Sequence, residues 1–146
     1  MNIPQSKELV GELKRITGEG FRTIALVTIS IVALFGLPLL LADRDLGLQF
    51  ILSIPPQAFI SVSWLLGMRL SFFRSQAVYL TLTLGMFPIR LAIEAGWYLL
   101  LKNRVFDDIF VAAVSGMIVL SVLMAVQTYY MCQVGNMKRS FGKYYE

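Results

Sequence analysis

Four long stretches of the chain are almost entirely apolar, and short polar stretches separate them. They cover residues 23–42, 46–68, 76–101 and 109–130. A helix needs about 20 mostly apolar residues to cross the hydrocarbon core of a bilayer, with a range of about 17–25. The stretches have about this length, so the pattern predicts an all-α integral membrane protein built as a four-helix bundle.

The second apolar stretch contains a Pro-Pro pair, Pro55 and Pro56, next to the polar residue Gln57. Two neighbouring prolines remove two amide donors from a helix, so a broken or re-entrant segment and a total of three crossings is one alternative. Prolines are nevertheless tolerated in membrane helices whose neighbours satisfy the freed carbonyls. We therefore expect a spanning helix that bends at the pair, and a second local kink at Pro88 in the third stretch.

The residues before the first apolar stretch predict a short amphipathic helix over residues 4–17. Its apolar positions recur at helical spacing, at Leu9, Leu13 and Ile16. Gly18 and Gly20 are expected to end it before the membrane begins. Such a helix either lies in the membrane interface, held by its leucines and by anionic lipid, or is a solvated lead-in whose basic residues only set the topology.

The composition agrees with a membrane protein. Of the 146 residues, 57% are hydrophobic and 15% are charged, and the mean hydropathy is +0.69. Soluble domains are about half apolar and about a quarter charged. We expect a single domain over residues 1–146, with a cytoplasmic or interfacial segment at 1–22, four helices over 23–131 and a cytoplasmic tail at 132–146.

Lysine and arginine are distributed unequally among the segments that flank the four stretches. If the N-terminus is inside, most of them lie on the inner side: Lys7, Lys14, Arg15, Arg22, Arg69, Arg74, Lys138, Arg139 and Lys143. The outer loops hold only Arg44, Lys102 and Arg104. Because cytoplasmic loops carry the excess of basic residues, both termini are predicted to be cytoplasmic.

Several kinds of chemistry are excluded by the residues that the sequence lacks. It contains no histidine, so histidine-ligated metals and a serine or cysteine nucleophile activated by histidine are ruled out. It contains one cysteine, Cys132, so an intrachain disulfide is ruled out as well. No glycine-rich phosphate-binding loop occurs. We expect no enzyme activity, no catalytic residue, no cofactor, no metal site and no nucleic-acid partner.

Arg90 and Glu94 stand out in the third stretch, because Glu94 is the only acidic residue inside an apolar segment. Counting along residues 76–101 places Arg90 near the middle of the membrane, where an arginine costs at least about 2.5–3.5 kcal/mol. The two residues lie four positions apart, so an ion pair on one helix face is expected. The pair either meets a partner subunit or a polar pathway, or packs inside the bundle against Gln49, Gln57 or Gln127.

The second half of the chain resembles ATP synthase protein I. The resemblance is carried by Gly85 and Arg90, the apolar run through Leu101 and a fourth helix that ends near Gln127. The Pro-Pro pair of the second stretch departs from that pattern. The resemblance implies an accessory protein that assists rotor-ring assembly or cation supply of a bacterial ATP synthase.

These observations together predict a small non-enzymatic protein of the bacterial inner membrane. We expect it to act as an accessory or assembly subunit of a larger complex, with lipid and other integral membrane subunits as partners and a homo-oligomer as a further option. The alternative is a small oligomeric transporter or channel with Arg90 and Glu94 in its pathway. The scattered positions of the polar residues within the apolar stretches favour the accessory role.

Overall fold

The computed structural model describes residues 3–74, 77–79, 81, 86–106 and 109–142, and these residues are helical apart from short connections. The helices, in chain order, are α1 (Ile3–Ile31), η1 (Val32–Gly36), α2 (Leu37–Ala42), α3 (Arg44–Leu52), α4 (Ile54–Ser71), α6 (Met86–Arg104) and α7 (Phe110–Gly142). The expectation of an all-α fold is therefore confirmed for the described part of the chain.

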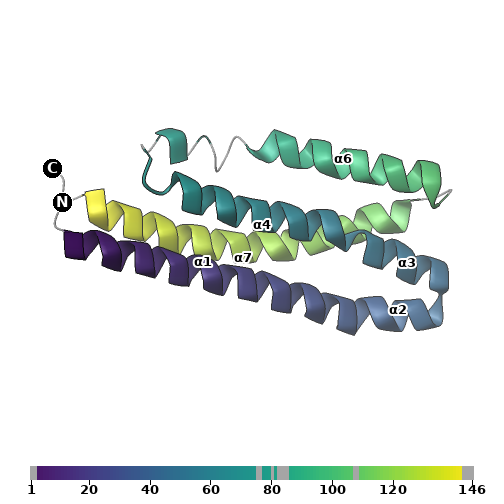
Figure 1. Ribbon diagram of the computed structural model, residues 1–146. Helices are drawn as coiled ribbons and strands as arrows, with labels where there is room; N and C mark the ends of the chain where they lie inside the picture. The colour runs from purple at the N-terminus through teal and green to yellow at the C-terminus, as the bar shows by residue number, and fades with distance from the viewer. Residues whose placement is uncertain (1–2, 75–76, 80, 82–85, 107–108, 143–146) are drawn as a thin grey trace.

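The first feature is one continuous helical run from residue 3 to residue 42, formed by α1, η1 and α2 (Figure 1). The predicted break at Gly18 and Gly20 is wrong. A glycine inside a helix costs only about 1 kcal/mol relative to alanine. At Gly20 that cost comes with close packing, because a Cβ there would stand 3.1 Å from the Leu65 side chain.

The apolar stripe of the N-terminal part of α1 faces the protein interior. Leu9, Leu13 and Ile16 are all buried, and they belong to the same hydrophobic cluster as Met68 and Val134 of the neighbouring helices. The sequence pattern therefore identified the apolar stripe correctly. The stripe packs against α4 and α7 of the same chain.

η1 is a short π-helical segment that lies directly before a proline. The amide of Leu37 donates to the carbonyl of Val32, one residue further back than in an α-helix. Pro38 follows and has no amide to donate, so the hydrogen-bond ladder is already interrupted at this point. Gly36 packs on Ile51, whose Cγ1 atom lies 3.1 Å from the position of a Cβ. The missing amide of Pro38 and the close packing of Gly36 on Ile51 together account for the π-helical segment.

A tight turn at Asp43 connects α2 to α3. The Asp43 carboxylate accepts hydrogen bonds from the amides of Asp45 at 2.9 Å and Leu46 at 3.2 Å, which caps the first turn of α3. Gly47 lies against the backbone of Leu40, where a Cβ would overlap that backbone. The chain therefore reverses direction within a few residues.

The second apolar stretch is interrupted immediately before its two prolines. α3 ends at Leu52, Ser53 is a turn residue, and α4 begins at Ile54 with prolines in its first turn. Two contacts satisfy carbonyls near the interruption: the Ser53 hydroxyl donates to the carbonyl of Phe50 at 2.6 Å, and the Trp97 indole donates to that of Leu52 at 2.8 Å. The two pieces follow one another along the molecule and do not fold back (Figure 1).

The helices α1, α4 and α7 pack against one another, and α6 lies along α4 (Figure 1). Gly20 of α1, Leu65 of α4 and Tyr130 of α7 meet at one level. Near the opposite end, the side chain of Gln49 in α3 accepts from the amide of Ala112 in α7 at 3.2 Å. The start of α1 and the end of α7 consequently lie at the same end of the molecule.

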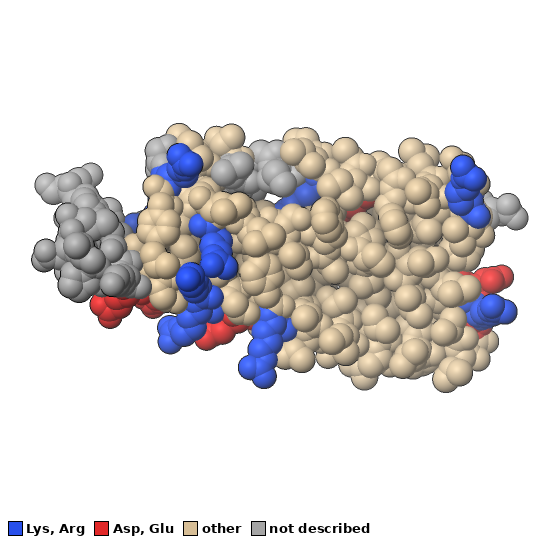
Figure 2. Space-filling view, in the orientation of Figure 1, with Lys and Arg blue, Asp and Glu red and all other residues tan. Residues whose placement is uncertain are grey.

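Within the described part of the chain, three helical runs are long and apolar enough to cross a membrane: Glu8–Ala42, Arg44–Ser71 and Phe110–Lys138. On the face shown in Figure 2, charged side chains gather toward the two ends, and a broad band between them is almost free of charge. The third apolar stretch is described only in part, since residues 75–76, 80 and 82–85 lie outside the described residues. Pro88 lies near the start of α6 as described, and Leu84, whose carbonyl is predicted to lose its amide donor at the kink, lies outside the described residues.

The alternative of three crossings assumed that the Pro-Pro segment would be the one that fails to cross. The structure instead includes that segment among the three qualifying runs, and the run that does not qualify among the described helices is α6. α6 contains Arg90, Glu94, Lys102 and Arg104, which lower its hydropathy.

Candidate functional site

Polar side chains from three helices meet beneath α6, within the otherwise apolar part of the bundle. Arg90, Glu94 and Tyr98 occupy successive turns of one face of α6. α4 contributes Gln57 and Ser61, and α7 contributes Gln127. All three side chains from α4 and α7 are buried, and Gln57 and Ser61 have no exposed surface.

Arg90 is held by α7 and α4. Its Nη1 atom donates to Oε1 of Gln127 at 3.4 Å, and the Gln127 amide nitrogen in turn donates to the Ser61 hydroxyl. Its guanidinium carbon lies 5.5 Å from the centre of the Trp64 ring, which is a cation–π distance. The second terminal nitrogen, Nη2, is buried and has no hydrogen-bond partner among the described residues.

Glu94 faces a different neighbour. The amide of Gln57 lies next to the Glu94 carboxylate and the Tyr98 hydroxyl. Nevertheless, Oε1 of Glu94, the Tyr98 hydroxyl and both polar atoms of the Gln57 amide lack a partner at hydrogen-bond geometry within the described part of the chain. Buried polar atoms are normally hydrogen-bonded, so this group is an unusual feature of the core.

The expected ion pair between Arg90 and Glu94 is not formed, although both residues are described. An acidic residue four positions after a basic one is the less favourable order for such a pair. The Arg90 guanidinium instead contacts Gln127 and Trp64. Of the three glutamines proposed as internal partners, Gln127 contacts Arg90, Gln57 lies next to Glu94, and Gln49 contacts α7 elsewhere.

The expected mid-membrane position of Arg90 stays a prediction, and the contacts of its guanidinium give its level within the bundle. The guanidinium contacts Gln127 and Trp64, which lie within one helical turn of Tyr130 and Leu65. Those two residues pack on Gly20, close to where the apolar run 23–42 of α1 begins. The long arginine side chain thus reaches toward the charged end of the molecule, as buried basic residues often do. Gln57, beside Glu94, stands near the midpoint of the apolar run Arg44–Ser71.

Two residues belong to this site in roles that the sequence did not predict. Tyr98 places its hydroxyl directly over Gly116 of α7, where a Cβ would overlap it. Ser61 joins Gln127 to α4. The spacing of Tyr98 four residues after Glu94 was the available signal for a shared face, whereas the contact with Gly116 depends on how α6 and α7 approach each other.

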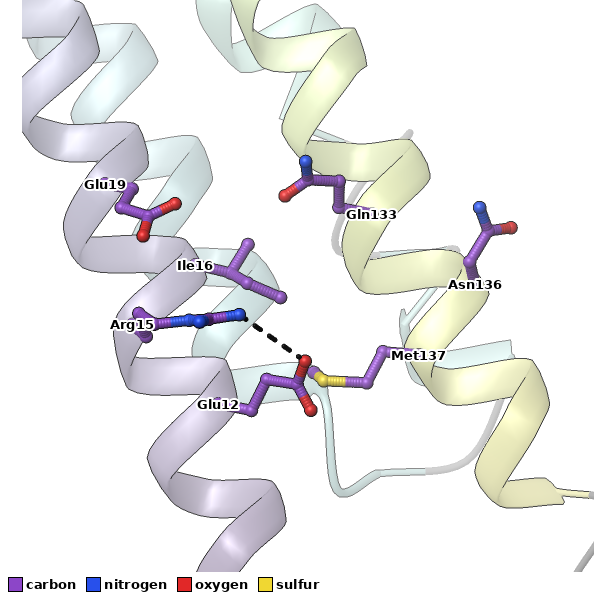
Figure 3. A pocket seen from close by; sticks show the side chains of 7 residues that line it. All are labelled: Glu12, Arg15, Ile16, Glu19, Gln133, Asn136 and Met137. Atoms are coloured by element: carbon purple, nitrogen blue, oxygen red, sulfur yellow. Dashed lines mark ion pairs between the residues drawn. The ribbon is translucent and has the colours of Figure 1, made fainter.

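A second hollow lies between α1 and α7, at the end of the molecule that carries the chain termini. It is a cleft of about 550 Å³ lined by Glu12, Arg15, Ile16 and Glu19 of α1 and by Gln133, Asn136 and Met137 of α7 (Figure 3). On the α1 side of the cleft, Arg15 and Glu12 form an ion pair at 3.7 Å, and both side chains are largely exposed. Exposed pairs of this kind contribute about 0–1 kcal/mol, so the cleft is a solvated surface.

Among the residues that the structure describes, no three acidic, cysteine or histidine side chains come together as metal ligands would. No protein-family model, curated protein sequence or solved structure matches the chain.

Proposed function

We propose that this chain is a small non-enzymatic membrane protein that acts as an accessory or assembly subunit, and that it binds its partner complex through α6. The observation that carries the proposal is the outer face of α6. Ala92, Ala95 and Gly96 are exposed there, on the side opposite Arg90 and Glu94. Small residues on a membrane helix allow another helix to approach closely, and this favours helix–helix association within lipid.

The path of the chain supports four crossings of the membrane. α4 runs toward the end that carries the termini, and α7 runs in the same direction (Figure 1). The chain between them must return along the whole length of the bundle, and α6 follows that return path, with Trp97 at the level of Leu52. If the three apolar runs span the bilayer, the segment that contains α6 therefore crosses it as well.

The distribution of basic residues supports a bacterial inner-membrane protein with both termini in the cytoplasm. The resemblance to ATP synthase protein I makes a rotary ATP synthase the first complex in which to look for the protein. In that complex it would assist assembly of the rotor ring or the supply of cations.

The test places a bulky residue on the outer face of α6 without disturbing the chain's own packing. Gly96→Leu suits this purpose, because among the described residues no atom outside its own helix lies within 4 Å of a Cβ at Gly96. Gly67→Leu on α4 is the control, since no described atom of another element lies within 4 Å of a Cβ there either. We expect Gly96→Leu to keep the abundance of the protein and to lose co-purification of the native complex in mild detergent.

The control variant should retain both abundance and partner. Wild-type recovery of the complex by Gly96→Leu would refute the α6 interface. Absence of any stoichiometric complex, together with ion flux through purified protein in vesicles, would instead favour the oligomeric transporter.

A further inference from the structure

The cleft between α1 and α7 has polar side chains directed into it, and one contact between the two helices fixes its level. The hydroxyl groups of Thr23 and Tyr130 are hydrogen-bonded at 2.8 Å. Glu19 lies one turn before Thr23 on α1, and Gln133 lies within one turn after Tyr130 on α7. The side chains of Glu19 and Gln133 point into the space between the helices (Figure 3). The cleft therefore begins one turn beyond the contact between Thr23 and Tyr130.

This level is the membrane boundary in the proposed topology. The first apolar stretch begins at residue 23, and at about 1.5 Å per residue Glu19 lies about 6 Å before it along α1. Tyr129 is exposed at the same level on α7, as tyrosines at a membrane–water interface are. The cleft therefore lies at the depth of the hydrated lipid headgroups of the cytoplasmic leaflet.

The charged side chains of α1 alternate in sign beside the cleft. Neighbouring members of the series are three or four residues apart and so share one helix face: Glu12, Arg15, Glu19 and Arg22. Arg15 pairs with Glu12 at 3.7 Å, whereas Glu19 and Arg22 form no ion pair within the described part of the chain. One carboxylate and, a turn closer to the membrane, one guanidinium are thus open to a ligand.

The order of these groups along α1 matches the order of groups in a zwitterionic phospholipid. From the cytoplasm toward the membrane, α1 presents the carboxylate of Glu19, the guanidinium of Arg22 and then exposed apolar residues such as Leu26. A phospholipid with an ethanolamine headgroup presents an ammonium, a phosphate and acyl chains in the same order. The ammonium donates hydrogen bonds to a carboxylate, and a phosphate accepts them from a guanidinium. The volume of about 550 Å³ lies within the range of small-molecule sites, so a headgroup fits.

We propose that the cleft binds one phospholipid of the phosphatidylethanolamine type from the cytoplasmic leaflet. Its ammonium enters the cleft and donates to Glu19, with Gln133 on the opposite wall. Its phosphate accepts from Arg22, and its acyl chains follow the exposed side chains of Leu26 and Tyr129 into the bilayer. The inference rests on the proposed membrane location with cytoplasmic termini, and it is independent of the interface assigned to α6.

The test measures lipid adducts of the purified full chain by native mass spectrometry. The three probes share their acyl chains and differ in the headgroup, which is ethanolamine, choline or glycerol. Choline has no N–H group and glycerol has no positive charge, so neither replaces the ammonium at Glu19. We expect the ethanolamine lipid to bind about fivefold more tightly than the other two, which corresponds to about 1 kcal/mol, the upper end for an exposed ionic contact. Soluble glycerophosphoethanolamine, which has the same headgroup and no acyl chains, should not compete.

Two pairs of variants assign the headgroup contacts. Glu19→Gln keeps the size of the side chain and removes its charge, so it should abolish the preference for ethanolamine over choline. Glu8→Gln, at an exposed position of α1 outside the cleft lining, is the matched control and should keep that preference. Arg22→Gln should weaken the binding of both lipids equally, since both carry the phosphate. Its control, Lys14→Gln, should weaken neither.

Four results would overturn the proposal: equal binding of the ethanolamine and choline lipids by the wild type, equal binding of the glycerol lipid, an unchanged preference in Glu19→Gln, or competition by the soluble headgroup. None of these variants alters α6, so Glu19→Gln should recover the native complex as the wild type does. Failure of the lipid site and failure of the α6 interface are therefore measured separately.

Discussion

At the scale of single residues, the contact between Tyr98 and Gly116 shows what the sequence could and could not predict. Glycine in a membrane helix signals a close approach, but the approaching atom cannot be read from the sequence. Here it is the end of a rigid aromatic side chain from another helix. Similarly, the spacing of Arg90 and Glu94 predicted a shared face correctly. The direction of each side chain, and therefore the partner of each charge, depended on α4 and α7.

This contact gives a prediction about stability. Gly116→Ala should lower the free energy of unfolding by about 1–3 kcal/mol, because the added methyl group overlaps the Tyr98 hydroxyl. Tyr98→Phe removes that hydroxyl and should recover part of the loss in the double variant. Thermal unfolding in detergent measures both effects. Gly67→Ala, at an open position, should be neutral or stabilising, and an equal loss there would show that the Tyr98 contact is not the cause.

At the scale of elements, the apolar lengths predicted where helices occur, and the glycine and proline positions predicted their boundaries less well. The interruption before Pro55 and Pro56 lies where the missing amides require it. Gly18 and Gly20 do not end α1, because the energetic penalty of an internal glycine is small and the Leu9, Leu13 and Ile16 stripe is buried by other helices. Local propensity was therefore overruled by tertiary packing.

The attachment of α6 to the Pro-Pro segment gives a second prediction. Trp97→Phe leaves the Leu52 carbonyl without its donor, which should cost about 1–3 kcal/mol. We expect faster amide hydrogen exchange in α6, with little change in α1 and α7. Pro56→Ala restores an amide four residues after Leu52, so adding it should slow exchange in the Trp97→Phe variant. Unchanged exchange in the single variant would argue against this role of Trp97.

At the scale of the whole molecule, the sequence predicted an all-helical chain with apolar runs of membrane length, and the structure agrees. The arrangement of the runs could not be predicted from lengths alone. It follows from long-range contacts such as those of Gly20 with Leu65 and Tyr130. Counting along one helix likewise ignores how far a side chain reaches, so the level of the Arg90 guanidinium depends on its contacts with Gln127 and Trp64.

The arrangement predicts the topology of the protein in cells. Cysteines introduced at positions 2 and 144, in a Cys132→Ser background, should react only from the cytoplasmic side. A cysteine at Asp43, in the turn between α2 and α3, should react from outside. Membrane-impermeant maleimide labelling of intact and opened cells measures this. Labelling of positions 2 and 144 from opposite sides would contradict four crossings.

The hydrogen bond between Trp97 and Leu52 also has a consequence for synthesis of the chain. The two residues are 45 positions apart, and a ribosome adds about 5–20 residues per second. In the proposed topology, the Leu52 carbonyl is therefore synthesised several seconds before its donor. During that interval it needs another donor, either a water molecule or a component of the insertion machinery. The Pro-Pro segment should accordingly stay in contact with that machinery until α6 has been completed.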